Sequence, residues 1–190
     1  MNSFIEKDSN RDKLISILLP TYNESQNIAK MLNSLITVLP QKFQIEIIVI
    51  DDDSPDGTGK IAEDYKTKIS NENISMKIIH RKNKRGLSSA ILDGIHSSTG
   101  NIIVVMDSDF SHPPETIEKM LDTLLDDESD IVIGSRFVPG GESVGWPLSR
   151  KIMSKFGTKI PELFLNVKVK DSTSGFFSFK KEIVKNVNFD

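Results

Sequence analysis

Residues 45–53 read IEIIVIDDD and residues 102–109 read IIVVMDSD. In both stretches a nearly continuous apolar run ends abruptly in carboxylates. Such runs are typical of strands buried on both faces, as in a parallel sheet covered by helices. Ligands of open parallel sheets bind beyond the carboxyl ends of the strands, so acidic residues at that position are candidate binding residues. The two stretches therefore predict an α/β fold with a site at one edge of the sheet.

The rest of the chain alternates between short apolar runs and segments with helical spacing of apolar residues. Further strands are predicted at residues 14–19, 75–79, 131–134 and 175–179, and helices at residues 28–39, 61–69, 87–95, 117–125 and 148–164. We expect an open, mostly parallel sheet flanked by helices in one domain over residues 14–190. Residues 1–13 are polar and charged and are expected to form an N-terminal tail.

Composition excludes several classes of protein. The 190 residues carry a net charge of -3, which gives no general attraction to nucleic acid. There is no cysteine, so disulfides and thiolate metal sites are excluded and any metal must bind oxygen or imidazole ligands. No apolar run approaches the roughly 18–20 residues of a membrane-spanning helix. Without a signal peptide pattern, we expect a cytoplasmic location.

The acidic strand ends have both a functional and a structural interpretation. Asp107 and Asp109 leave the sheet edge together and suit Mg²⁺ or Mn²⁺, which would neutralise a diphosphate; alternatively the motif only caps a strand and starts a turn. Asp51, Asp52 and Asp53 crowd one strand end, where repulsion calls for a cation, a base edge or a ribose hydroxyl. The alternative for these three is a solvated turn.

Basic residues and a histidine are weaker candidates. Arg136 and Arg150 flank a Gly- and Pro-rich loop and suit bidentate contact with phosphate, although scattered surface charge is the alternative. The basic cluster of Arg81, Lys82, Lys84 and Arg85 is expected to form a solvated loop, with anion binding as the alternative. Trp146 is interpreted as a packing anchor or a ligand contact. His112 is interpreted as a structural residue more readily than as a metal ligand.

Several motifs together resemble a known family. They are PTYNE at residues 20–24, VIDDDSPD at 49–56, MDSDFSHPPE at 106–115, GLSSA at 86–90, GSR at 134–136, WPLSRK at 146–151 and DSTSGF at 171–176. In this combination the sequence resembles the family 2 inverting glycosyltransferases, and within them the branch that makes dolichyl-phosphate mannose. The resemblance extends from residue 15 to residue 179 and is specific only when the motifs are taken jointly.

The resemblance implies a GT-A fold, a nucleotide-sugar donor with GDP-mannose favoured, and a dolichyl or polyprenyl phosphate acceptor at the cytoplasmic face of a membrane. It implies donor contacts from Pro20, Tyr22, Glu24, Ile50, Asp52, Asp107, Ser108, Asp109 and Arg136. Catalytic roles fall to Asp107, Asp109, Arg136 and Arg150. The implied Mg²⁺ or Mn²⁺ ligands are Asp107, Asp109 and Ser111, the last standing where the family pattern has glutamine.

An acceptor phosphate is already anionic near neutral pH, so attack with inversion needs positioning and charge neutralisation but no general base. The sequence also ends before the region in which such enzymes place further basic and interfacial segments, so we expect a domain truncated at its C-terminal end. Three alternatives stay open: a UDP-glucose-dependent glucosyltransferase, a haloacid-dehalogenase-like phosphohydrolase, and a non-catalytic nucleotide-sugar binding module.

Overall fold

The computed structural model describes residues 13–83, 86–126, 129–135, 171, 174–185 and 187. Within these ranges the strands are β1 (Leu14–Thr21), β2 (Gln44–Asp51), β3 (Ile74–His80), β4 (Ile102–Val105), β5 (Ile131–Ile133) and β6 (Phe177–Lys180). The helices are α2 (Ile28–Val38), α3 (Thr58–Lys66), α4 (Leu87–Ser97), α5 (Thr116–Leu125) and the short 3-10 helix η1 (Lys181–Val184).

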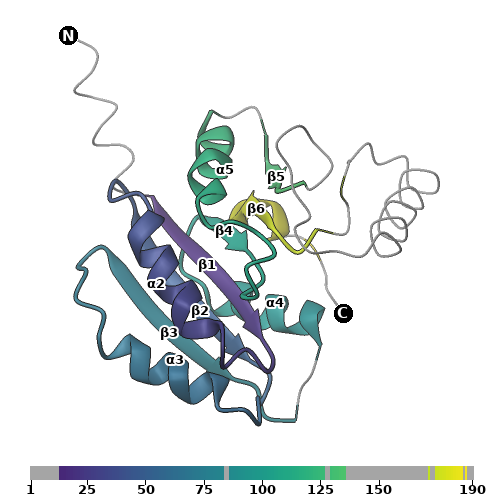
Figure 1. Ribbon diagram of the computed structural model, residues 1–190. Coiled ribbons are helices and arrows are strands. Elements are labelled where there is room, and N and C mark those ends of the chain that lie inside the picture. Colours follow the sequence, from purple (N-terminus) through teal and green to yellow (C-terminus); the bar gives the residue numbers. More distant parts are fainter. Residues whose placement is uncertain are drawn as a thin grey trace, which may run out of the picture.

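The strands form one sheet in the order β3-β2-β1-β4-β6-β5. Strands β3, β2, β1 and β4 are parallel to one another, whereas β6 runs antiparallel between β4 and β5. Figure 1 shows β1 inside the sheet, with β2 and β4 on its two sides. The expected open, mostly parallel α/β sheet is therefore confirmed. Its parallel part brings the carboxyl ends of four strands to one edge.

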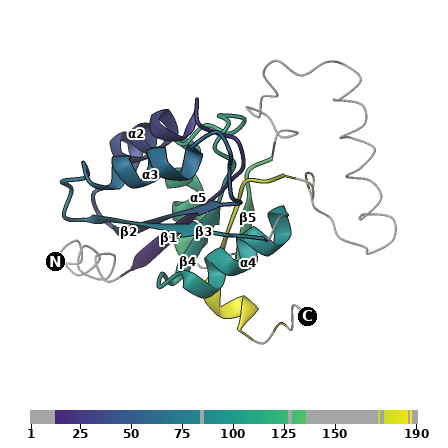
Figure 2. The same cartoon turned by 90° about the horizontal axis from the view of Figure 1, so that it is seen from below.

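Helices cover both faces of the sheet. Figure 2 shows α2 and α3 on one side, and α4 with η1 on the other. Successive residues of β1 face these two layers in turn: Ile17 and Leu19 belong to the core under α2, α3 and α5, and Leu18 belongs to the core under α4. All three are fully buried. Burial on both faces explains why the strands are continuous apolar runs rather than alternating ones.

Helix α2 illustrates how the sequence sets an element and its end. Its buried residues Ile28, Met31, Leu32 and Leu35 recur at the spacing of one helical face. Pro40 stands two residues after the last helical residue, Val38, and a proline disfavours helical backbone in the residue before it. Leu39 accordingly is extended, with φ -67 and ψ 136.

Differences from the sequence prediction are small in the described part of the chain. Strand β4 ends at Val105, and α3 begins at Thr58 and ends at Lys66, so Ile69 packs on the core from beyond the helix. The helix expected at residues 148–164 and residues 1–12 of the expected tail lie outside the described residues. No helix that the structure describes has both the length and the apolar character needed to cross a bilayer.

Candidate active site

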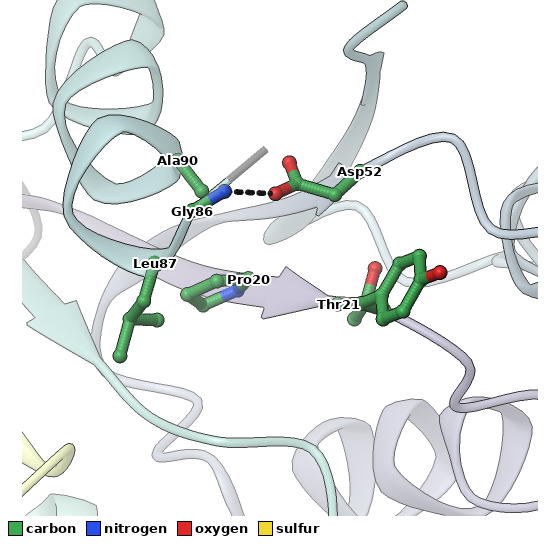
Figure 3. Close-up of a pocket in the computed structure, with 7 residues that line it drawn as sticks. Pro20, Thr21, Asp52, Gly86, Leu87 and Ala90 are labelled. Atoms are coloured by element: carbon green, nitrogen blue, oxygen red, sulfur yellow. Dashed lines mark hydrogen bonds between the residues drawn. The ribbon is translucent and has the colours of Figure 1, made fainter. Parts of the chain in front are cut away.

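A cavity of about 250 Å³ opens at the carboxyl edge of the sheet. It is lined by residues from the end of β1, the residue after β2 and the start of α4, namely Pro20, Thr21, Tyr22, Asp52, Gly86, Leu87 and Ala90. In Figure 3 the Asp52 carboxylate faces Gly86, while Pro20 and Leu87 form apolar walls. One carboxylate among apolar walls suits a flat ring that has hydrogen-bond donors on one edge.

The Asp52 carboxylate is bonded through both oxygens. Its Oδ1 accepts a hydrogen bond from Nη1 of Arg81, and its Oδ2 accepts one from the Gly86 amide at 2.9 Å. The Arg81 side chain is only 2% exposed. The positive partner of this carboxylate is therefore supplied by the chain itself. Of the partners that the sequence interpretation offered, which were a cation, a base edge and a ribose hydroxyl, the structure supplies the cation as Arg81.

Arg81 also makes contacts on α4. Its Nε donates to Oδ2 of Asp93 at 2.9 Å, and its Nη2 donates to Oγ of Ser89 at 2.6 Å. The prediction that Arg81 belongs to a solvated basic loop is wrong, because its buried guanidinium satisfies two carboxylates. A signal was present in the sequence: Arg81 directly follows β3, and so stands at the same sheet edge as the acidic motifs.

The neighbouring aspartates point elsewhere. Asp51 is 4% exposed, and its Oδ2 lies 3.7 Å from Nδ1 of His80 on β3. Gly59 of α3 lies against this carboxylate, since a Cβ there would come within 2.7 Å of the same oxygen. Asp53 is exposed and has a positive φ of 54. Of the three aspartates, only Asp52 lines the cavity, because strand alternation turns Asp51 toward the opposite layer.

Glu24 and Ile50, which the resemblance places among the donor contacts, do not line the cavity. Ile50 is fully buried in the core beneath α4. The Glu24 carboxylate accepts a hydrogen bond from Nδ2 of Asn27 at 2.8 Å, and the Glu24 amide donates to Oγ1 of Thr58 at 2.8 Å. The structure thus brings together Pro20, Tyr22 and Asp52, whereas the donor roles of Glu24 and Ile50 stay predictions.

The loop that contains Glu24 is tied to the loop before α3 by Asp56. Its Oδ1 accepts from the Thr58 amide at 3.0 Å and from the Thr58 hydroxyl at 2.6 Å, and its Oδ2 accepts from the Ser25 amide at 3.0 Å. Desolvation acts to raise the pKa of Asp56, but the hydrogen bonds from Thr58 and Ser25 outweigh it and lower the pKa to about 2. This carboxylate has a structural role beside the cavity.

The second acidic motif follows β4. Leu18 of β1 pairs with Val105 of β4, so Asp107, two residues further on, begins level with the cavity residue Pro20. Asp109 is exposed, and its Oδ1 accepts from the amide of Ser111 at 2.8 Å. The cavity therefore lies at the end of β1, and the two carboxylates follow the neighbouring strand β4.

Two serines, Ser108 and Ser111, lie in the same loop as Asp107 and Asp109. Ser108 is 2% exposed, and its hydroxyl has no hydrogen-bond partner within the described residues. Ser111 is exposed, beside the carboxylate pair. Across the described ranges, no three His, Cys, Asp or Glu side chains gather in a way that holds a metal ion. An ion at Asp107 and Asp109 would need ligands beyond these side chains.

Two residues crowd Asp107. A Cβ on Gly175 would lie 2.6 Å from Oδ2 of Asp107, so this position has room for glycine alone unless the carboxylate moves. His112 is 5% exposed, with its Nε2 3.9 Å from the same oxygen and its ring 5.1 Å from that of Phe176. This burial fits the structural interpretation of His112. No local pattern in the sequence indicated that Gly175 contacts the acidic motif.

Arg136 and Arg150 lie outside the described residues, as does Trp146. Their predicted contacts with phosphate or with a ligand therefore stay predictions.

Similar proteins match almost the whole chain. Dolichol-phosphate mannosyltransferase of Pyrococcus furiosus is 39% identical over 93% of this chain and 49% of its own length. Undecaprenyl-phosphate mannosyltransferase of Micrococcus luteus is 34% identical over 91% of this chain and 69% of its own length. Polyprenol monophosphomannose synthase of Mycolicibacterium smegmatis is 33% identical over 90% and 63%, respectively. This chain thus spans about half to two thirds of the length of these relatives.

Solved glycosyltransferases share the fold. Glucosyl-3-phosphoglycerate synthase of Mycobacterium tuberculosis, in complex with Mn²⁺, UDP-glucose and phosphoglyceric acid, has a TM-score of 0.69 at 18% identity, over 94% of this chain and 60% of its own. A mannosyltransferase of Pyrobaculum calidifontis, in complex with GDP-mannose and Mn²⁺, has a TM-score of 0.61 at 19% identity, over 90% and 45%. The expected GT-A-type fold is therefore confirmed.

The sequence pattern described as glycosyl transferase family 2 matches residues 16–187. That range contains both acidic strand ends and the cavity between them. This chain belongs to glycosyl transferase family 2.

Proposed function

We propose that the chain carries the catalytic domain of an inverting, metal-dependent glycosyltransferase that moves mannose from GDP-mannose to a dolichyl or polyprenyl phosphate. One observation carries the proposal: a cavity with a single carboxylate, Asp52, opens beside the end of β1, and the neighbouring strand β4 leads into Asp107 and Asp109. A nucleoside in the cavity and a diphosphate at the carboxylate pair require this adjacency. The names of the three relatives support the mannosyl donor and the lipid phosphate acceptor.

The residues present fit a divalent ion. Asp107 and Asp109 offer hard oxygen ligands from one turn, and Gly175 lacks the Cβ that would fill the space beside Asp107. Mg²⁺ and Mn²⁺ accept one or two carboxylates and take their other ligands from water and phosphate oxygens. When bound, the ion supplies positive charge that neutralises the diphosphate leaving group. Ser111, exposed next to Asp109, is the further ligand in this proposal, directly or through water.

The chain's own residues then bind and orient. Asp52 accepts hydrogen bonds from the base, and Pro20 and Tyr22 pack on the nucleoside. Asp107 and Asp109 would hold the divalent ion, and its positive charge would keep the diphosphate end in place so that the sugar's anomeric carbon faces the acceptor. Because the acceptor phosphate is already anionic, positioning and charge neutralisation suffice, and attack opposite the leaving group inverts the anomeric centre.

The acceptor side of the proposal rests on Arg136 and Arg150, whose guanidinium groups suit bidentate contact with phosphate. A lipid phosphate places the reaction at a membrane surface, and we propose peripheral attachment at the cytoplasmic face. The family membership gives no support to the haloacid-dehalogenase alternative. UDP-glucose stays as a competing donor, because one solved relative of the same fold binds it.

Calorimetric titration tests the donor. GDP-mannose, GDP, UDP-glucose and UDP are titrated into the protein with Mn²⁺ and again with EDTA. We expect GDP-mannose and GDP to bind only with the ion present, and binding to be lost in Asp109→Ala. The matched control is Asp122→Ala, which removes an exposed carboxylate of α5 that pairs with Lys42. Transfer of labelled mannose to a polyprenyl phosphate then tests the acceptor.

Each contrary outcome is informative. Tighter binding of UDP and UDP-glucose than of GDP and GDP-mannose would indicate a glucosyltransferase instead of a mannosyltransferase. Binding of GDP-mannose without any transfer to polyprenyl phosphate would indicate a nucleotide-sugar binding module. Absence of binding by all four nucleotides would overturn the proposal for this chain.

A further inference from the structure

We propose that Arg81 is a positioning residue of the cavity: it fixes the Asp52 carboxylate against the first turn of α4 and thereby sets the fit of the base. This inference rests on the proposed function for the identity of the ligand. It rests on the described contacts for the geometry. Arg81 does not line the cavity, so its effect passes through the residues that it holds.

The guanidinium joins three elements. Arg81 stands directly after β3, and its three nitrogens bond to Asp52 after β2 and to Ser89 and Asp93 on α4. A planar arginine fork holds several partners in fixed directions, whereas a lysine ammonium does not. The side chain is 2% exposed, so these charge-assisted bonds are little weakened by water. Arg81 is therefore a rigid brace behind one end of the cavity.

The braced parts are the two polar walls of the cavity. Asp52 and Gly86 face each other across a 2.9 Å hydrogen bond, as Figure 3 shows. Gly86 has φ 125, a conformation that strongly favours glycine, and it leads directly into α4. Arg81 also donates to the Gly86 carbonyl at 3.4 Å. The same residue thus holds both sides of the contact.

The bonding pattern leaves acceptor capacity for a ligand. Two carboxylate oxygens offer about four lone-pair sites. The described bonds to Arg81 and Gly86 use one on each oxygen, which leaves the outer pair for donors on the edge of a base. Without Arg81 the carboxylate rotates, and its two remaining lone-pair sites no longer face the cavity in a fixed direction.

The experiment compares ligands with and without a base. Binding of GDP and of pyrophosphate, each with Mn²⁺, is measured for the wild type, Arg81→Lys, Asp93→Asn and Ser89→Ala. Loss of charge-assisted bonds of this kind corresponds to about tenfold weaker binding, so we expect that loss for GDP in Arg81→Lys and a smaller one in the other two. Pyrophosphate binding should not change. Lys42→Met, which removes an exposed cation that pairs with Glu118 of α5, is the matched control.

A second readout needs no ligand. Amide hydrogen exchange of residues 86–90 in the free protein should speed up about tenfold in Arg81→Lys, because the first turn of α4 loses its brace. Unchanged exchange there, or equal weakening of GDP and pyrophosphate, would overturn the positioning role. Faster exchange in Arg81→Lys, together with a wild type that binds no nucleotide, would support the positioning role of Arg81. The same result would reject the proposed function.

Discussion

The two acidic strand ends of this sheet differ in how their charges are balanced. At the end of β2, Asp52 is bonded to a buried arginine and to a backbone amide. At the end of β4, Asp109 is exposed and accepts from the amide of Ser111 in its own loop. At the first end the charge is balanced without a ligand, which suits recognition of a neutral base edge. The second presents carboxylate charge to solvent, which suits a divalent ion and a diphosphate.

The difference shows that a run of like charges in a sequence does not reveal its own compensation. Three consecutive aspartates indicate more negative charge than the pair after β4, yet the buried member of the run that lines the cavity is neutralised from another strand. Variants at each end should therefore fail in different ways. We propose that the end of β2 binds the nucleoside and call it the nucleoside end, and that the end of β4 binds the metal ion and call it the metal end. Variants at the nucleoside end should affect stability and base recognition, and variants at the metal end should affect turnover.

The largest effect is expected at the metal end. Asp109→Ala removes one of two carboxylates, and lost stabilisation of several kcal/mol on the leaving group corresponds to a roughly 10³-fold lower rate. The folded protein should be unaffected, because Asp109 is exposed. Steady-state transfer assays and a thermal melt check both halves. A rate within tenfold of wild type would remove Asp109 from the metal site.

At the nucleoside end, Asp52→Ala should lower the stability of the fold. It leaves the Arg81 guanidinium buried with one carboxylate partner fewer, and loss of one member of a buried ion pair costs about 3 kcal/mol. Urea unfolding measures this cost. Asp52→Ala combined with Arg81→Met should recover part of it, since no unpaired charge then remains buried. An unchanged unfolding midpoint in Asp52→Ala would contradict the description of Arg81 as its counter-charge.

A matched pair of glycine variants separates metal binding from packing. In Gly175→Ala the new methyl group displaces the Asp107 carboxylate, and disturbed support of a ligand typically costs at least about tenfold in metal affinity. In Gly134→Ala the methyl group instead meets the buried Phe176 ring, so stability should fall by about 1–3 kcal/mol. Mn²⁺ titration and thermal melts of both variants give the comparison. Equal effects of the two on Mn²⁺ affinity would refute this distinction.

The smallest effect concerns Asp56 and acid. Its pKa is lowered to about 2 in the folded protein from an ordinary value of 3.8. Its contribution to stability is therefore present above about pH 4 and is lost as the pH falls toward 2. Asp56→Asn should flatten the fall in stability between pH 4 and pH 2, by a small amount because the carboxylate is exposed. Unfolding midpoints measured across this range test the slope, and an identical slope would contradict the assignment.

Much of the fold could be predicted because its signals are local. Continuous apolar runs and helical stripes depend on neighbouring residues, and β1 to β4 and α2 to α5 lie within a few residues of their predicted positions. The site was predictable only as far as strand ends determine it. Arg81 and Gly175 act through partners 29 and 68 positions away, at Asp52 and Asp107, and contacts between distant segments leave no periodic pattern. Ile50 is a core residue in the structure, and its predicted contact with the donor stays a prediction.

The contact between the chain before and after residues 136–170 has a consequence for changes in the length of that segment. The Gly134 amide donates to the Phe176 carbonyl at 2.8 Å, and the Ser174 hydroxyl donates to the Gly134 carbonyl at 2.8 Å. The two ends of this segment are thus hydrogen-bonded to each other. The contact lies next to Gly175, the glycine against the Asp107 carboxylate. Evolution can lengthen, shorten or replace the intervening sequence without moving either end. A change in that sequence can therefore leave Gly175, and the Asp107 carboxylate against which it lies, in place.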